Sequence, residues 1–186
     1  MVDILAFLRR ELGEEGIPAV LEAAGEKRPL EVLWDPSVWS SYQQLRAVME
    51  AISARLGGSE ALAGAGEVMI DEDHPGNYME SMHEFGSPGA VLDGVPEMGV
   101  QIAPIVEFGS ERVNDTEWIL STRVREGFEP FRELCALHLG EYRTFPKMFG
   151  FTEVEAVQEQ CQVDGAHECL LRVRWEVNSE LERRAE

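Results

Sequence analysis

Residues 154–177 read VEAVQEQCQVDGAHECLLRVRWEV and contain a pattern typical of a β-hairpin. Apolar and polar side chains alternate from Cys169 to Val177, which is typical of a β-strand with one buried face. Residues 154–163 are expected to form the preceding strand, and Asp164-Gly165 favours a tight turn between the two. The stretch therefore predicts an antiparallel hairpin that carries a cysteine on each side of its turn.

A second hairpin and a helix are expected before this stretch. Strands are predicted at Ile102–Phe108 and Glu117–Arg125, with turn residues at Val113–Thr116. From Phe128 to about Leu139, apolar residues recur at three- and four-residue steps, which is typical of an amphipathic helix. Gly140 is expected to lie near its end. We therefore expect an α+β fold: an N-terminal helical part followed by a four-stranded, mainly antiparallel sheet with helices packed on one face.

The N-terminal part is predicted to be mostly helical. The expected helices are Val2–Leu12, Gly16–Ala24, Ser37–Leu56, Ser59–Ile70, Gly76–Glu84 and a short helix from Pro88 to about Leu92. The last is expected to stop there because Asp93-Gly94 and Pro96 disfavour its continuation. We divide the chain into a helical part (1–100), an α+β part with the cysteines (101–177) and the start of a connecting helix (178–186).

The net charge of the chain excludes some classes of binding partner. Its 186 residues include 16 Lys and Arg against 35 Asp and Glu, giving a formal net charge of −19. No basic surface is available to neutralise phosphates, so we expect neither nucleic acid nor an anionic membrane as a partner. No apolar run approaches the roughly 18–20 residues that span a bilayer, and the N-terminus lacks a signal-peptide pattern, so we expect a cytoplasmic protein.

The three cysteines, Cys135, Cys161 and Cys169, are expected to approach one another. The first lies on the apolar face of the predicted helix, and the other two lie at the mouth of the hairpin. Three interpretations are open: cysteines of the apolar core, a disulfide across the hairpin mouth, or a tetrahedral zinc site. A fourth zinc ligand would come from Glu159, His167, Gln158 or water.

The sequence around these cysteines resembles the 4-vinyl reductase domain, which is also the sensor of the phenol- and xylene-responsive transcription activators. The resemblance rests on CALHLG at 135–140, FG at 149–150 and CQVDGAHEC at 161–169, and it covers roughly residues 100–177. In those sensors the helix cysteine also precedes the first loop cysteine by 26 residues, and the loop cysteines are also eight apart. The domain is distantly related in fold to the haem-nitric-oxide-binding domains.

The resemblance implies a structural Zn²⁺. In the sensors, a glutamate three residues before the first loop cysteine completes the site. Gln158 occupies that position here, and Glu159 follows it. The implied metal ligands are therefore Cys135, Cys161, Cys169 and Glu159.

The resemblance also implies a ligand-sensing input domain of a bacterial-type signalling or regulatory protein that binds a small hydrophobic or aromatic molecule. Leu33–Pro36 and Arg172–Trp175 resemble segments of sensors that precede an output domain. We therefore expect an attached output domain and a homodimer, because an exit helix signals most simply as a pair. No nucleophile elbow, phosphate loop or zinc-protease motif occurs, so we do not expect an enzyme.

Aromatic and histidine side chains are the candidates for lining a ligand pocket, although each also fits a packed core. The candidates are Trp39, His83, Trp118, Phe131, His138 and Tyr142. Haem is the alternative cofactor and would need a proximal histidine, with His138 or His83 as candidates. The Tyr-x-Ser-x-Arg motif that holds the propionates in the haem-nitric-oxide family is not found.

Overall fold

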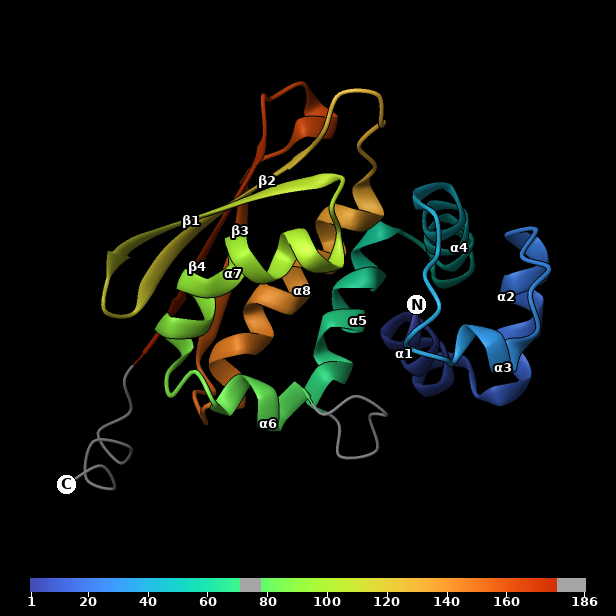
Figure 1. The fold of residues 1–186 in the computed structure, drawn as a ribbon, viewed down its shortest axis with the longest axis horizontal. Helices are drawn as coiled ribbons and strands as arrows, with labels where there is room; N and C mark the ends of the chain where they lie inside the picture. The colour runs from blue at the N-terminus through green and yellow to red at the C-terminus, as the bar shows by residue number, and fades with distance from the viewer. Residues whose placement is uncertain (71–77, 177–186) are drawn as a thin grey trace. The chain divides into compact units, whose positions relative to one another are not determined.

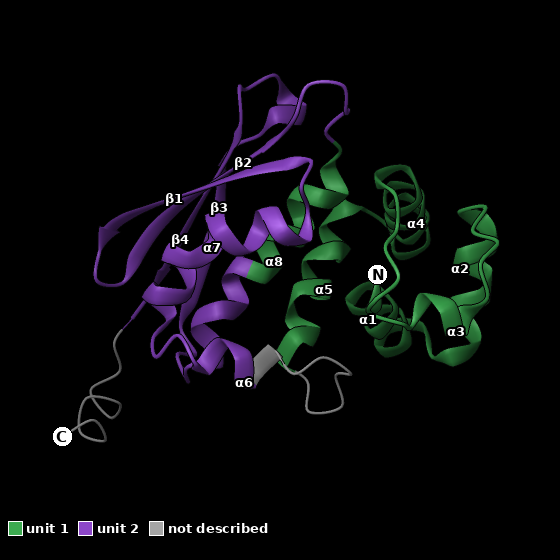
Figure 2. Ribbon diagram, in the orientation of Figure 1, with its two compact units in different colours: residues 1–77, 131–141 green, residues 78–130, 142–186 purple. Residues whose placement is uncertain are grey.

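The computed structural model describes residues 1–70 and 78–176, and within them the chain forms two compact units (Figure 2). These are unit 1, residues 1–77 and 131–141, and unit 2, residues 78–130 and 142–186. The division differs from the sequence-based boundary at residue 100: residues 78–130 belong with the sheet, and residues 131–141 belong with the N-terminal helices. The expected connecting helix at 178–186 lies outside the described residues.

Unit 1 is built from short helices. They are α1 (Val2–Leu12), η1 (Glu14–Gly16), α2 (Ile17–Ala23), α3 (Leu30–Leu33), α4 (Tyr42–Leu56), η2 (Ser59–Leu62), α5 (Ala63–Glu67), η3 (Val68–Ile70) and the first part of α8 (Arg132–Met148). The helix predicted from Ser37 begins instead at Tyr42. The reason is that Ser41 and Gln44 form a reciprocal capping box, which satisfies the free backbone N–H groups at this point. Trp39 therefore lies outside the helix.

A close approach between α5 and α8 explains why α8 does not end at Gly140. A Cβ atom at Gly140 would lie 1.8 Å from the carbonyl oxygen of Ala63, and one at Gly66 would lie 2.1 Å from the backbone nitrogen of Glu141. Both glycines are needed because the two helices touch backbone to backbone. The sequence-based end near Leu139 was wrong, and α8 continues to Met148 with Pro146 inside its last turn.

Unit 2 contains the sheet (Figure 1). Its elements are α6 (Tyr78–His83), α7 (Pro88–Ile102), β1 (Val106–Asn114), β2 (Glu117–Val124), β3 (Val154–Gln160), η4 (Gln162–Asp164), β4 (Cys169–Trp175) and the second part of α8. The strand order is β1-β2-β4-β3, and every neighbouring pair is antiparallel. The α+β class and the four-stranded antiparallel sheet are thus confirmed.

Helix α7 is longer than the sequence predicted. It was expected to end near Leu92, but it runs to Ile102 with Pro96 inside it, so β1 begins at Val106 rather than Ile102. Packing on the sheet outweighs the one backbone hydrogen bond that a proline removes. Cβ atoms at Gly89 and Gly99 would lie 2.8 Å from the Trp118 ring and 2.6 Å from the Phe108 ring, so α7 rests directly on β2 and β1.

The two faces of the sheet differ in chemistry. Leu120, Leu171 and Val173 are fully buried on the face that meets α7. On the opposite face, Arg172 of β4 forms ion pairs with Glu117 of β2 and Glu159 of β3, both at 2.5 Å. The alternating pattern of β4 therefore separates an apolar inner face from an outer face of paired charges. No helix in the described part of the chain is long and apolar enough to cross a membrane.

Candidate functional site

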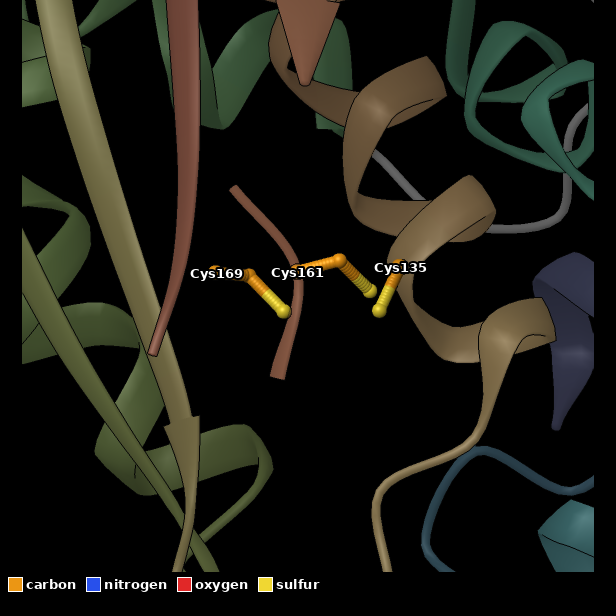
Figure 3. A group of neighbouring side chains, drawn as sticks. All are labelled: Cys135, Cys161 and Cys169. Atoms are coloured by element: carbon orange, nitrogen blue, oxygen red, sulfur yellow. The ribbon is translucent and has the colours of Figure 1, made fainter. Parts of the chain in front are cut away.

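The three cysteine sulfur atoms lie together. The Sγ atoms of Cys135, Cys161 and Cys169 are all within 4.8 Å of one another, and all three residues are buried (Figure 3). The side chains point toward one another from α8 and from the two ends of the loop between β3 and β4. The convergence that the sequence spacing predicted is therefore present.

The local secondary structure sets the direction of each cysteine side chain. Cys135 lies in the first turn of α8, where its thiol donates to the carbonyl oxygen of Phe131 at 3.7 Å. Cys161 follows β3 and precedes η4, and Cys169 is the first residue of β4, on its buried face. The loop between them turns at Gly165, whose φ of 93° is a left-handed conformation that favours glycine.

The distances between the sulfur atoms bear on the three interpretations of the cysteines. None of the three forms a disulfide. Thiolates that share one tetrahedral zinc at about 2.3 Å stand roughly 3.8 Å apart, so a bound ion requires the sulfurs to move by about 1 Å at most. The arrangement is compatible with a metal site as well as with a cluster of buried thiols.

The fourth metal ligand expected from the sequence is not near the sulfurs. Among the described residues, the group of possible ligand side chains contains only the three cysteines. The Glu159 carboxylate instead accepts a hydrogen bond from Arg172 on the outer face of the sheet, at 2.5 Å. His167 lies 2.8 Å from Arg123, and the Gln158 amide donates to the carbonyl oxygen of Gln160 at 3.3 Å. These three side chains are therefore engaged elsewhere, and the register of β3 against β4 shifts between Gln158 and Gln160.

The two histidines proposed as haem ligands lie in different surroundings. His138 of α8 is buried, and burial lowers the pKa of its imidazole to about 4. Its ring is therefore neutral at physiological pH, the form that can ligate a metal. His83 of α6 has its Nε2 atom 2.6 Å from the carbonyl oxygen of Met148 and its ring beside Phe149.

The aromatic candidates are also placed differently from one another. Trp39 is 64% exposed and precedes α4. Trp118 is buried, donates from Nε1 to Asp93 at 2.7 Å and stacks on Trp175. Phe131 and Tyr142 are buried, and Phe131 packs edge-on against Tyr42.

Two polar residues near these candidates had no clear signal in the sequence. Asp93 was read as a residue that ends a helix, but its carboxylate holds the Trp118 indole from the middle of α7. Gln162 was placed near the end of the strand predicted at 154–163, but its side chain and backbone both make hydrogen bonds at the cysteine loop. Only the fold brings their partners into reach, so sequence spacing alone could not identify them.

Comparison with solved structures identifies the fold. The chain is similar to an unliganded Fe(II) H-NOX protein from K. algicida, with a TM-score of 0.68 and 14% identity, covering 96% of this chain and 97% of that one. It is similar to an H-NOX protein from S. oneidensis in the Fe(II)NO state, with a TM-score of 0.67 and 14% identity, covering 95% and 99% of the two chains. For an oxygen-binding H-NOX domain related to soluble guanylate cyclases, the TM-score is 0.62 with 13% identity, covering 95% and 92%.

These similarities establish that the chain has the H-NOX fold. The expected relation in fold to the haem-nitric-oxide-binding domains is thereby confirmed. No family model and no curated protein sequence matches the chain. The narrower resemblance to the 4-vinyl reductase domain therefore has no support from these comparisons.

Proposed function

We propose that this chain is a ligand-sensing regulatory domain on the H-NOX fold, with a zinc ion held by Cys135, Cys161 and Cys169. The observation that carries the zinc site is the mutual approach of three buried sulfur atoms to within 4.8 Å. Zinc favours thiolate ligands and has no redox chemistry of its own, so it cross-links segments distant in sequence without depending on an oxidising compartment. Its binding would require the three thiols to lose their protons.

The proposed ligands are the three cysteines alone, whereas the sequence resemblance implied a four-ligand site completed by Glu159. Glu159 is committed to Arg172, and three thiolates leave a fourth tetrahedral position for water or an exogenous ligand. We propose that water or an exogenous ligand occupies this fourth position. A zinc ion with such a position can bind a small ligand there. The same ion stabilises the fold by joining the segments that carry the cysteines.

The regulatory role rests on the fold and on the sequence resemblance together. The H-NOX neighbours support a sensor domain, and the 4-vinyl reductase resemblance supports a small hydrophobic or aromatic ligand. In this proposal the chain itself is not an enzyme, and it acts as a homodimer on an attached output domain. Ligand binding shifts the population between two arrangements of the helices over the sheet.

Haem is the second candidate cofactor, and the structural neighbours favour it over a zinc-dependent aromatic sensor. The S. oneidensis neighbour is described in an Fe(II)NO state. In this chain, buried His138 is the residue that would hold the iron, because its imidazole is neutral at physiological pH. Haem would supply a site for binding a diatomic gas.

Metal content and the absorption spectrum, measured on one preparation made without a metal-binding tag, separate these proposals. About one zinc per chain without a Soret band supports the thiolate site. A Soret band that is lost in a His138→Ala variant supports the haem sensor and overturns the zinc proposal if zinc is absent. Neither zinc nor a Soret band, after reconstitution with Zn²⁺ and with haemin, would contradict both.

A further inference from the structure

The loop that joins Cys161 to Cys169 is closed by its own backbone. The carbonyl oxygen of Cys161 accepts hydrogen bonds from the backbone N–H groups of Asp164 at 3.0 Å and Ala166 at 3.1 Å. Gly165 donates to the carbonyl oxygen of Gln162 at 3.1 Å. These bonds shape the loop, but they do not attach it to the rest of the sheet.

Gln162 makes that attachment. Its Oε1 atom accepts from the backbone N–H of Val124 at 3.0 Å, and its Nε2 atom donates to the carbonyl oxygen of Val124 at 3.2 Å. The ladder between β2 and β4 ends at the pair Thr122 and Cys169, so Val124 lies beyond the last residue of β2 that pairs with β4. A carboxamide has the same donor and acceptor as a peptide group. The side chain of Gln162 therefore extends the sheet by one further partner.

The same residue also contacts a sulfur atom. The backbone N–H of Gln162 donates to the Sγ atom of Cys169, with nitrogen and sulfur 3.2 Å apart. A neutral thiol is a weak acceptor, whereas a thiolate forms a charge-assisted and stronger hydrogen bond. An N–H group held against Cys169 therefore helps to fix the position of the sulfur atom that the proposed metal site uses.

We propose that Gln162 is the positioning residue of the cysteine metal site: its side chain fastens the loop to Val124, and this directs its own backbone N–H at Cys169. The inference rests on the proposed metal site and adds a residue that is not a ligand. Residues that orient metal ligands typically change metal affinity by about 10- to 100-fold when they are replaced. We expect a loss of that size from Gln162→Met, which keeps the length of the side chain and removes both of its hydrogen bonds.

A purely structural role for Gln162 makes a different prediction. If the side chain only stabilised the loop, Gln162→Met would lower the melting temperature equally with and without metal, and the metal-loaded site would look unchanged. A positioning role instead weakens metal binding in the folded protein and alters the spectrum of the metal. Gln158→Met is the matched control, because that amide lies on β3 three residues before Cys161 and donates to the carbonyl oxygen of Gln160.

The experiment uses the full chain, reduced and stripped of metal, with Zn²⁺ and Co²⁺ as the probes. Zn²⁺ affinity is measured by competition with a chromophoric chelator, and Co²⁺ reports the coordination through its thiolate charge-transfer and ligand-field bands. We expect Gln162→Met to bind Zn²⁺ about 10- to 100-fold more weakly and to shift the Co²⁺ bands. We expect Gln158→Met to stay within about twofold of the unsubstituted chain. If Gln162→Met does not fold, Gln162→Glu carries the same test, because it keeps the acceptor for the N–H of Val124 and loses the donor to the Val124 carbonyl oxygen.

Two negative outcomes are distinguishable. If the unsubstituted chain binds Zn²⁺ and Gln162→Met binds it within about twofold with the same Co²⁺ spectrum, the positioning role is wrong and the proposed metal site stands. If the unsubstituted chain binds neither ion, the proposed metal site fails and this inference fails with it.

Discussion

The acidic side chain of Glu141 gives a pH dependence that the structure predicts in sign and size. Glu141 lies on α8, partly buried, and its burial together with the nearby Asp3 raises its pKa from 4.5 to about 8. The folded chain therefore keeps a proton between pH 4.5 and 8 that the unfolded chain has lost. Because the folded state binds more protons there, the free energy of unfolding falls as pH rises, by up to about 1.4 kcal/mol per pH unit.

His138 contributes with the opposite sign in a lower range. Burial lowers its pKa from 6.5 to about 4, so the unfolded chain binds the extra proton between pH 4 and 6.5. Its contribution to stability rises with pH across that range and is complete above 6.5. Between pH 4.5 and 6.5 the contributions of Glu141 and His138 oppose each other. From pH 6.5 to 8 the Glu141 contribution falls by about 2 kcal/mol, and the N-terminal amine of Met1, whose pKa is lowered by burial, opposes this fall.

Glu141→Gln isolates the carboxyl group. Urea unfolding is followed by circular dichroism at steps from pH 4.5 to 8.5, with a chelator present because metal affinity is itself pH-dependent. The difference in unfolding free energy between the variant and the unsubstituted chain should grow with pH, to at most about 5 kcal/mol at pH 8. A difference that stays constant across this range would refute the argument, because the carboxyl group would then titrate alike in both states.

Substitutions at four further positions test other contacts of the fold and the site. Gly140→Ala forces a methyl group against a carbonyl oxygen of α5 at 1.8 Å and should lower the unfolding free energy by about 3 kcal/mol, measured by urea denaturation. Asp93→Ala leaves the buried Trp118 indole N–H without its acceptor and should cost about 1–3 kcal/mol, whereas Asp93→Asn, which keeps an oxygen acceptor, should cost less. Cys135→Ser should reduce bound zinc measured by elemental analysis, and Glu159→Gln should leave it unchanged, because Glu159 pairs with Arg172.

Local patterns predicted the parts of the fold that depend on local chemistry. The alternation in residues 169–175 identified β4 and its buried face, and the spacing of the cysteines predicted their convergence. Both predictions are correct because a strand has a fixed side-chain period and because a hairpin brings its two ends together. The antiparallel sheet followed from the same reasoning.

The errors arose where packing outweighs local preference. Pro96 and Gly140 were read as residues that end helices, yet both lie inside helices. Gly140 is present because α5 approaches α8 too closely for a side chain, and α7 continues past Pro96 because its glycines rest on aromatic rings of the sheet. A single sequence does not reveal such contacts, since their cause lies in a partner distant along the chain.

The choice between zinc and haem depends on donor atoms, not on the fold. The H-NOX fold is shared with iron-binding proteins at about 14% identity, a level at which the ligands of a site need not be kept. A thiolate site needs several sulfurs within reach of one ion, and the three cysteines already meet that condition. An iron site needs an imidazole at an open coordination position, and buried His138 supplies the neutral imidazole. Because the two donor sets do not share a residue, Cys135→Ser and His138→Ala must affect different cofactors, and a protein that binds both would lose them independently.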